Sequence, residues 1–229
     1  MYDYNYYQLE ANFNSELQCS VESLSSFRAS SFELALEVII KGEDFAFFPI
    51  ESLSLNLKKI YDLNIYTREE FLFNKEDDPN SSKQTLKKHY NDSISSLINN
   101  ALYESLNKAE NEFCKYGIDK GVLGRWVSRP STVEFWHADV LFPQAQHRII
   151  IPLTAPGTFF CNVTIEEKAP FLKAFSDNNP ARKPIWEKCN EQELDYQLAA
   201  HEGAIYKTSS IHKGPKAINR TFIMFYVYD

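Results

Sequence analysis

The chain has 229 residues, of which 44% are hydrophobic and 24% are charged, and its formal net charge is −7. This length allows one large domain or two small ones with a sizeable buried core. The acidic balance argues against a nucleic-acid partner, because proteins that bind nucleic acids usually present a basic face. No apolar run is long enough to span a bilayer, and the polar, tyrosine-rich start does not resemble a signal peptide.

The four cysteines, Cys19, Cys114, Cys161 and Cys189, are far apart and form no CxxC pair. This pattern predicts reduced thiols in a cytosolic setting. We therefore expect a cytoplasmic protein that makes no contact with a membrane.

The first half of the chain reads as mainly helical. Ser30 to Glu33 has the pattern of a capping box, and Gly42 supplies a stop signal. The predicted elements are a helix in ELALEVIIK (33–41), a strand in DFAFFPI (44–50), a helix in ESLSLNLKKIYDL (51–63) and a loop in EEFLFNKEDDPNSSKQ (69–84).

One long apolar stripe follows that loop. It predicts a single helix, ending near Gly117 and packed on a sheet. Its members recur at spacings of mostly three and four residues: Leu86, Tyr90, Ile94, Leu97, Ala101, Leu106, Ala109 and Phe113.

From about Val122 the chain changes to short runs rich in β-branched and aromatic residues, which predict strands. These runs are VLGRWVS (122–128), EFWHADV (134–140), HRIIIPL (147–153), TFFCNVTI (158–165), GAIYKTS (203–209) and RTFIMFYVY (220–228). Short strands after helices indicate an α+β fold, with a jelly-roll core and an N-terminal helical segment packed on one sheet. We expect a single domain over 1–229, with 1–118 as mainly helical support and 119–229 as the core, which carries a loop insertion at 166–197.

His137 and Asp139 stand two apart in EFWHADV, so a strand would place both side chains on one face. His212 is the best third ligand among the five histidines, because distant strands become neighbours in a jelly roll. Two histidines and one carboxylate suit non-haem Fe(II), which must keep positions open. Arg220 opens the last strand and could bind a carboxylate through its fork of donors. The alternative is a pair of surface polar residues and a surface arginine at a strand end.

These motifs resemble those of the Fe(II)/2-oxoglutarate-dependent dioxygenases. HAD (137–139) and IHKGPKAINRTFIMF (211–225) follow that family's order of His-x-Asp, distant His and Arg. HRIIIPLTAPGT (147–158) is similar to its Arg-x-x-x-Pro-Leu strand. The resemblance covers about 122–229. One departure is Lys216, where several relatives carry an asparagine.

The resemblance implies a double-stranded β-helix (cupin-like) fold and a set of residue roles. His137, Asp139 and His212 would hold Fe(II), and Arg220 would bind the distal carboxylate of 2-oxoglutarate. Arg148 would assist at the cosubstrate, and Thr158 would offer a hydroxyl to the same carboxylate.

The implied reaction uses O2 and hydroxylates an unactivated C–H bond, with release of succinate and CO2; desaturation or ring formation stays open. The small size favours a small-molecule substrate, such as an amino acid or metabolite, with a peptide or protein side chain second. Segment 166–197, with Arg182 and Trp186, is either a lid over the substrate or a solvated excursion. Two other classes compete: a cupin-type metal enzyme that does not use 2-oxoglutarate, and a non-catalytic jelly-roll binding module.

Overall fold

A computed structural model describes residues 27–129, 134–139, 145–154, 157–173, 183–216 and 219–228. Cys19, Arg182 and the tyrosine-rich start lie outside these residues. The helices are α1 (Phe32–Ile40), the short 3₁₀ helix η2 (Ile50–Ser52), α2 (Leu55–Asp62), α3 (Pro79–Lys87), α4 (Asp92–Cys114), α5 (Ile165–Lys173) and α6 (Lys183–Glu191). The strands are β1 (Phe45–Pro49), β2 (Glu70–Phe73), β3 (Val122–Arg129), β4 (Ala145–Pro152), β5 (Phe159–Phe160), β6 (Glu202–Lys207), β7 (His212–Lys213) and β8 (Arg220–Tyr228).

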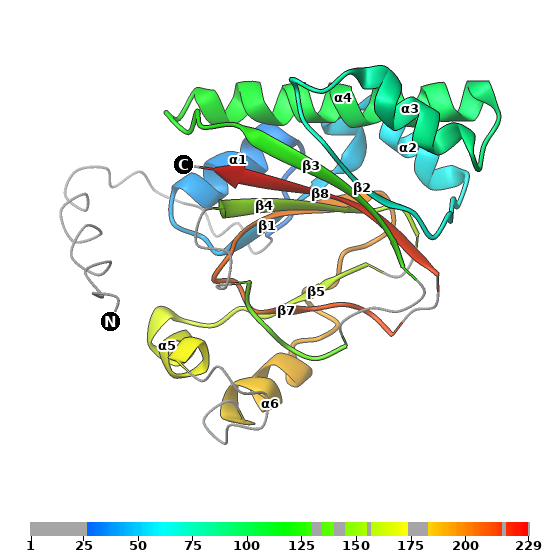
Figure 1. The fold of residues 1–229 in the computed structure, drawn as a ribbon. Helices are drawn as coiled ribbons and strands as arrows, with labels where there is room; N and C mark the ends of the chain where they lie inside the picture. Colours follow the sequence, from blue (N-terminus) through cyan, green and yellow to red (C-terminus); the bar gives the residue numbers. More distant parts are fainter. Residues whose placement is uncertain are drawn as a thin grey trace.

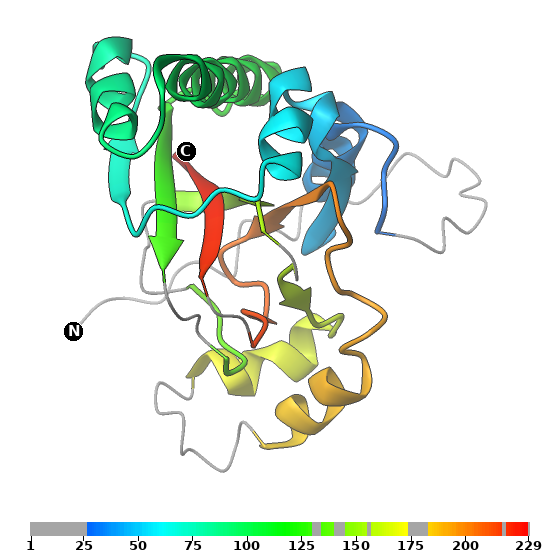
Figure 2. The same ribbon diagram turned by 90° about the vertical axis from the view of Figure 1, so that its right-hand side faces the viewer.

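Six strands form one antiparallel sheet in the order β1-β6-β4-β8-β3-β2, and β5 pairs with β7 in a second, small sheet. Helices α1 to α4 lie on one side of the large sheet, and the β5–β7 pair lies on the other (Figure 1). The turned view shows α5 and α6 beyond that pair, on the side away from α4 (Figure 2). This mixture of helices and antiparallel sheet fits the predicted α+β class. The edge strands β1 and β2 come from the first half of the chain, which therefore supplies more than helical support.

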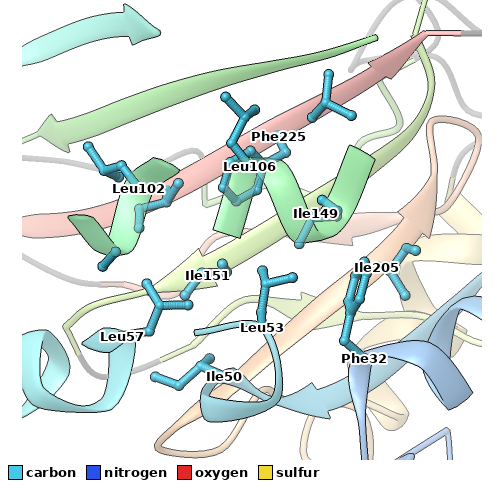
Figure 3. Packing of buried hydrophobic residues seen from close by; sticks show 14 of the residues in the cluster. Phe32, Ile50, Leu53, Leu57, Leu102, Leu106, Ile149, Ile151, Ile205 and Phe225 are labelled. Carbon is cyan, nitrogen blue, oxygen red and sulfur yellow. The ribbon is translucent and has the colours of Figure 1, made fainter. Parts of the chain in front are cut away.

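Side chains alternate between the two faces of the large sheet. Ile149 and Ile151 on β4, with Phe225 on β8, belong to the main core, where α4 packs through Leu102 and Leu106 (Figure 3). The residues in between face the other way, because successive strand residues point to opposite faces. Ile150, Phe222 and Met224 accordingly belong to the second cluster. The apolar stripe thus packs on a sheet as predicted, and the opposite face is left for the pocket described below.

The first half differs from prediction between residues 69 and 91. The expected loop contains β2 and most of α3, and the expected single helix is two helices, α3 and α4. Asp78 caps α3, with Pro79 in the first turn, and Asn91 caps α4. Both caps satisfy free N–H groups at a new helix start, which explains the break. The cap of α1 is Ser31, one residue after the predicted Ser30.

The second half also departs from the predicted strands. The described part of EFWHADV, residues 134–139, makes a bridge instead of a strand, in which His137 and His212 exchange two backbone hydrogen bonds of 2.9 Å. TFFCNVTI keeps only Phe159 and Phe160 as a strand, since the chain turns into α5 at Ile165. The described part of 166–197 is not a simple loop, because α5 and α6 occupy most of it.

The prediction of four reduced thiols is wrong, because Cys161 and Cys189 form a disulfide with a Cα–Cα distance of 5.0 Å. Cys114 is free and exposed. The disulfide ties α6 to the residue after β5, inside a third apolar cluster that includes Trp136, Phe171 and Ile185. The predicted cytosolic location was based on reduced thiols. It stays a prediction, but the thiols no longer support it. None of the described helices is long and apolar enough to cross a membrane.

We expect Cys189→Ser to lower the free energy of unfolding. The bond closes a loop of 28 residues, and the loss of such a cross-link costs about 2–4 kcal/mol. Urea unfolding measures the change, and the exposed free thiol provides the control Cys114→Ser, which should change stability by less than about 0.5 kcal/mol. Equal stability of Cys189→Ser and the wild type would contradict a structural disulfide.

Candidate metal centre

His137, Asp139 and His212 come together although 73 positions separate the last two. One ligand atom from each lies within 4.8 Å of the other two. The backbone positions them: the His137–His212 bridge joins the two segments, and the Asp139 N–H donates to the Thr208 carbonyl at 2.9 Å. The predicted face therefore exists, but one bridge and one hydrogen bond create it, rather than a full strand.

Backbone hydrogen bonds fix both imidazole rings. His137 Nδ1 lies 2.9 Å from the Phe135 carbonyl oxygen, and His212 Nδ1 lies 3.0 Å from that of Ser210. A carbonyl oxygen only accepts, so each Nδ1 carries a hydrogen, and Nε2 is the atom that a neutral ring would offer to a metal. Histidines that bind metals commonly donate their second N–H in this way.

Two neighbouring side chains, Arg148 and Tyr206, hold Asp139. Arg148 Nη1 lies 2.6 Å from Asp139 Oδ2, and the Tyr206 hydroxyl donates to the same oxygen at 3.5 Å. Burial, followed by the charge of Asp139, raises the pKa of Tyr206 far above its usual value, so Tyr206 stays a neutral donor. These two contacts orient the carboxylate.

His212 is 5% exposed, and Nε2 lies 3.4 Å from Asp139 Oδ2. Burial, reinforced by His137, lowers the pKa of His212 to about 4. The ring is therefore neutral at pH 7, the form in which imidazole binds a metal. Two imidazole nitrogens and one carboxylate are a donor set of the kind that non-haem Fe(II) uses, so the residues fit that ion.

Arg220 is a buried cation, 4% exposed. Its Nη2 donates to Thr158 Oγ1 at 2.6 Å, and its buried Nε has no hydrogen-bond partner among the described residues. Burial lowers the pKa of Arg220 to about 10, so it stays charged at neutral pH. A buried charge without a counter-charge is costly. The site therefore favours an anion beside Arg220.

A single pocket of about 270 Å3 joins these groups. All six core site residues predicted from the sequence line it: His137, Asp139, Arg148, Thr158, His212 and Arg220. Trp186 does not line this pocket and packs, partly buried, against the cluster around the disulfide. Arg182 lies outside the described residues.

Sequence reasoning missed Tyr206, which contacts Asp139. It also missed two arginines that line the pocket, Arg125 and Arg129. Arg125 lies in the predicted strand VLGRWVS (122–128) and Arg129 directly follows it, four residues later, so one more strand residue would have placed both on a common face. No comparable signal marks Tyr206, because its role depends on how β6 lies beside β4.

No protein-family model matches the chain, and no curated protein matches it. The structure is similar to solved structures of 2OG-Fe(II) oxygenases. One is an oxidoreductase of that family from Burkholderia pseudomallei, with 10% identity, a TM-score of 0.42, and coverage of 89% of this chain and 94% of that one. Another is the Kdo hydroxylase KdoO, a non-heme Fe(II) alphaketoglutarate dependent dioxygenase, with 15% identity, a TM-score of 0.47, and coverage of 89% and 86%. AviO1 from Streptomyces viridochromogenes Tue57 matches with 13% identity, a TM-score of 0.37, and coverage of 87% and 96%. At these TM-scores the likenesses decide neither the fold nor the function of this chain.

His212 makes the metal-free protein sensitive to acid. The unfolded chain protonates this residue near pH 6.5, whereas the folded protein keeps it neutral down to about pH 4. The unfolded state thus binds more protons in between, so the stability due to His212 is complete above about pH 6.5 and is lost as the pH falls through 4. The loss should reach roughly 3 kcal/mol, because a tenfold change in proton affinity corresponds to about 1.4 kcal/mol.

Urea unfolding in EDTA at pH 7.5 and pH 4.5 measures this loss. His212→Gln should show a smaller difference between the two pH values than the wild type, whereas the control Cys114→Ser, at an exposed free thiol, should behave like the wild type. The same difference in His212→Gln and wild type would contradict a buried neutral ring.

Proposed function

We propose that this chain is an Fe(II)/2-oxoglutarate-dependent oxygenase that hydroxylates an unactivated C–H bond of a small molecule, with release of succinate and CO2. The observation that carries this proposal is one pocket that holds both a His-Asp-His cluster and a buried arginine without a carboxylate partner among the described residues. The first feature supports a metal with open positions, and the second supports an anionic cosubstrate.

Fe(II) would be held by His137, Asp139 and His212. The chemistry that such an iron supplies when bound is the activation of O2, coupled to oxidative decarboxylation of the cosubstrate. The chain's own residues prepare the site for it. Both rings present Nε2 because Nδ1 is engaged by the backbone, and Arg148 and Tyr206 orient the carboxylate.

2-Oxoglutarate would place its distal carboxylate on Arg220. The guanidinium is fixed by Thr158 through Nη2, and Nε remains as a donor. The Cζ atom of Arg220 lies over the Phe222 ring, 4.9 Å from the ring centroid, and this cation–π contact holds the guanidinium in place. A prepositioned guanidinium loses little conformational entropy when a carboxylate binds.

We also propose that the β5–β7 pair and the large sheet are the two sides of a double-stranded β-helix. The pair carries His212 and follows Thr158, and the large sheet supplies Arg148 and Arg220. A metal and cosubstrate held between the two sheets would explain why the pocket lining comes from both.

The two competing classes are less well supported. In a metal enzyme that does not use 2-oxoglutarate, the buried charge of Arg220 would have no anionic ligand to bind. In a non-catalytic binding module, His137 and Asp139 would be surface residues, yet the Asp139 side chain is only 13% exposed and its carboxylate is ion-paired with Arg148.

An anaerobic titration of metal-free protein with Fe(II) and then 2-oxoglutarate tests the proposal through the weak visible charge-transfer band of the chelate. We expect the band in the wild type and in the control His89→Ala, and its loss in His212→Ala. Arg220→Ala should weaken 2-oxoglutarate binding by about 10- to 100-fold, because a charge-assisted hydrogen bond contributes roughly 1.5–3 kcal/mol.

Three results would count against the proposal. Metal binding without a band would indicate a metal enzyme of another class. No metal binding would indicate a binding module. Unchanged 2-oxoglutarate affinity in Arg220→Ala would remove the cosubstrate role of Arg220.

A further inference from the structure

Arg125 and Arg129 line the same pocket but have no part in the site described so far. Both lie on β3, with Val127 between them on the same face. Their side chains are 30% and 42% exposed, so they stand where the pocket opens rather than in its depth.

The ladder between β3 and β8 sets Arg129 directly opposite Arg220. Both side chains line the pocket, so two guanidinium groups share one face of adjacent strands. Like charges in directly opposite positions destabilise a sheet. Such a pair is favoured when an anion binds between or beside the two groups.

The charge of the pocket is unbalanced. Four arginines line it, Arg125, Arg129, Arg148 and Arg220, whereas Asp139 is the one carboxylate among the described lining residues. Glu70, on the edge strand β2, is paired with both Arg125 and Arg129 from outside the lining. In the proposed enzyme the two charges of Fe(II) and the two of 2-oxoglutarate cancel. The four arginines, less the charges of Asp139 and Glu70, therefore leave two positive charges in excess.

One of these two charges lies at Arg125 and Arg129, which share the single carboxylate of Glu70. Arg125 donates to the Tyr226 hydroxyl at 3.1 Å and is paired closely with Glu70. Arg129 holds Glu70 loosely, with Nη2 at 3.4 and 3.5 Å from the two carboxylate oxygens. One glutamate thus serves two guanidiniums, and the loosely held one has donors to offer to a ligand.

Apolar side chains continue the lining on this part of the sheet. Phe222 and Met224 on β8 lie opposite Val127 and Arg125 on β3. A ligand with a charged head on the arginines would have a carbon skeleton against these side chains, within the pocket that the His-Asp-His cluster also lines.

We propose that the substrate is a small anion with a carboxylate or phosphate group, which Arg125 and Arg129 bind while its carbon skeleton lies along Val127, Phe222 and Met224. This inference rests on the proposed function, because it assigns the substrate of that oxygenase. It narrows the substrate to a negatively charged metabolite and makes Glu70 a competitor of the substrate for the two arginines.

Nitrogen-proton correlation spectra of the Zn(II)-loaded protein test this assignment, since Zn(II) is diamagnetic and supports no turnover. Inorganic phosphate and acetate serve as the probes, at constant ionic strength set by NaCl and in the presence of saturating 2-oxoglutarate. The Nε–H signals of the two arginines, assigned from Arg125→Gln and Arg129→Gln, report binding. Phosphate binding tighter than acetate binding would identify a phosphorylated substrate, and the reverse order a carboxylated one.

We expect saturable shifts of both arginine signals with at least one of the two probes, phosphate or acetate. Arg129→Gln should weaken binding at least about tenfold, as expected when a charged donor pair is lost. Glu70→Gln should tighten it about three- to tenfold, because it removes the competing carboxylate. A gain of affinity cannot come from a folding defect, which makes Glu70→Gln the decisive variant. The charge-matched control Lys115→Gln, at the end of α4, should change affinity by less than twofold.

Shifts no larger than those caused by NaCl, or no gain in Glu70→Gln, would overturn the proposal. Shifts that appear in a parallel titration without 2-oxoglutarate but not in its presence would also overturn the proposal, because the pair would then belong to the cosubstrate site. The signals of the two histidine rings report the binding of Zn(II), and the signal of Arg220 reports the binding of 2-oxoglutarate. If these respond while Arg125 and Arg129 do not, the substrate assignment fails and the proposed function stands; if they do not respond, the proposed function fails.

Discussion

The buried charge of Arg220 is the constraint on which the site depends. The first residue of β8 points into the protein at 4% exposure, and Thr158 satisfies only part of its guanidinium among the described residues. A protein that carries such a charge in a low-dielectric site loses stability to it. An anionic ligand would offset that cost, which supports the proposal that the pocket binds a carboxylate at Arg220.

The large sheet explains how one short sequence makes both a core and a site. Alternation sends Ile149, Ile151 and Phe225 toward α4 and sends Arg148 and Met224 the other way. The helices therefore bury most of one face, and the opposite face is free to carry charge. The His137–His212 bridge then brings the candidate metal ligands over that face with very little secondary structure.

Much of the candidate site could be predicted from the sequence, because it depends on spacing. His137-x-Asp139 and the position of Arg220 at a strand start are local features, and all the core site residues line one pocket. The loop at 69–84 was predicted wrongly because its charges hid the alternation that buries Phe73 in β2. The Cys161–Cys189 disulfide was missed because it depends on how α6 packs against the end of β5, which no spacing records. The Arg129–Arg220 pair needed the strand register, which is a property of the folded sheet.

The most direct test is an anaerobic crystal structure of the protein with Fe(II) and 2-oxoglutarate, with anomalous scattering recorded at the iron edge. We expect an anomalous peak bound by Nε2 of His137, Nε2 of His212 and the Asp139 carboxylate, and density for 2-oxoglutarate that ends on Arg220. Iron at any other position, or 2-oxoglutarate bound away from Arg220, would contradict the proposed oxygenase site.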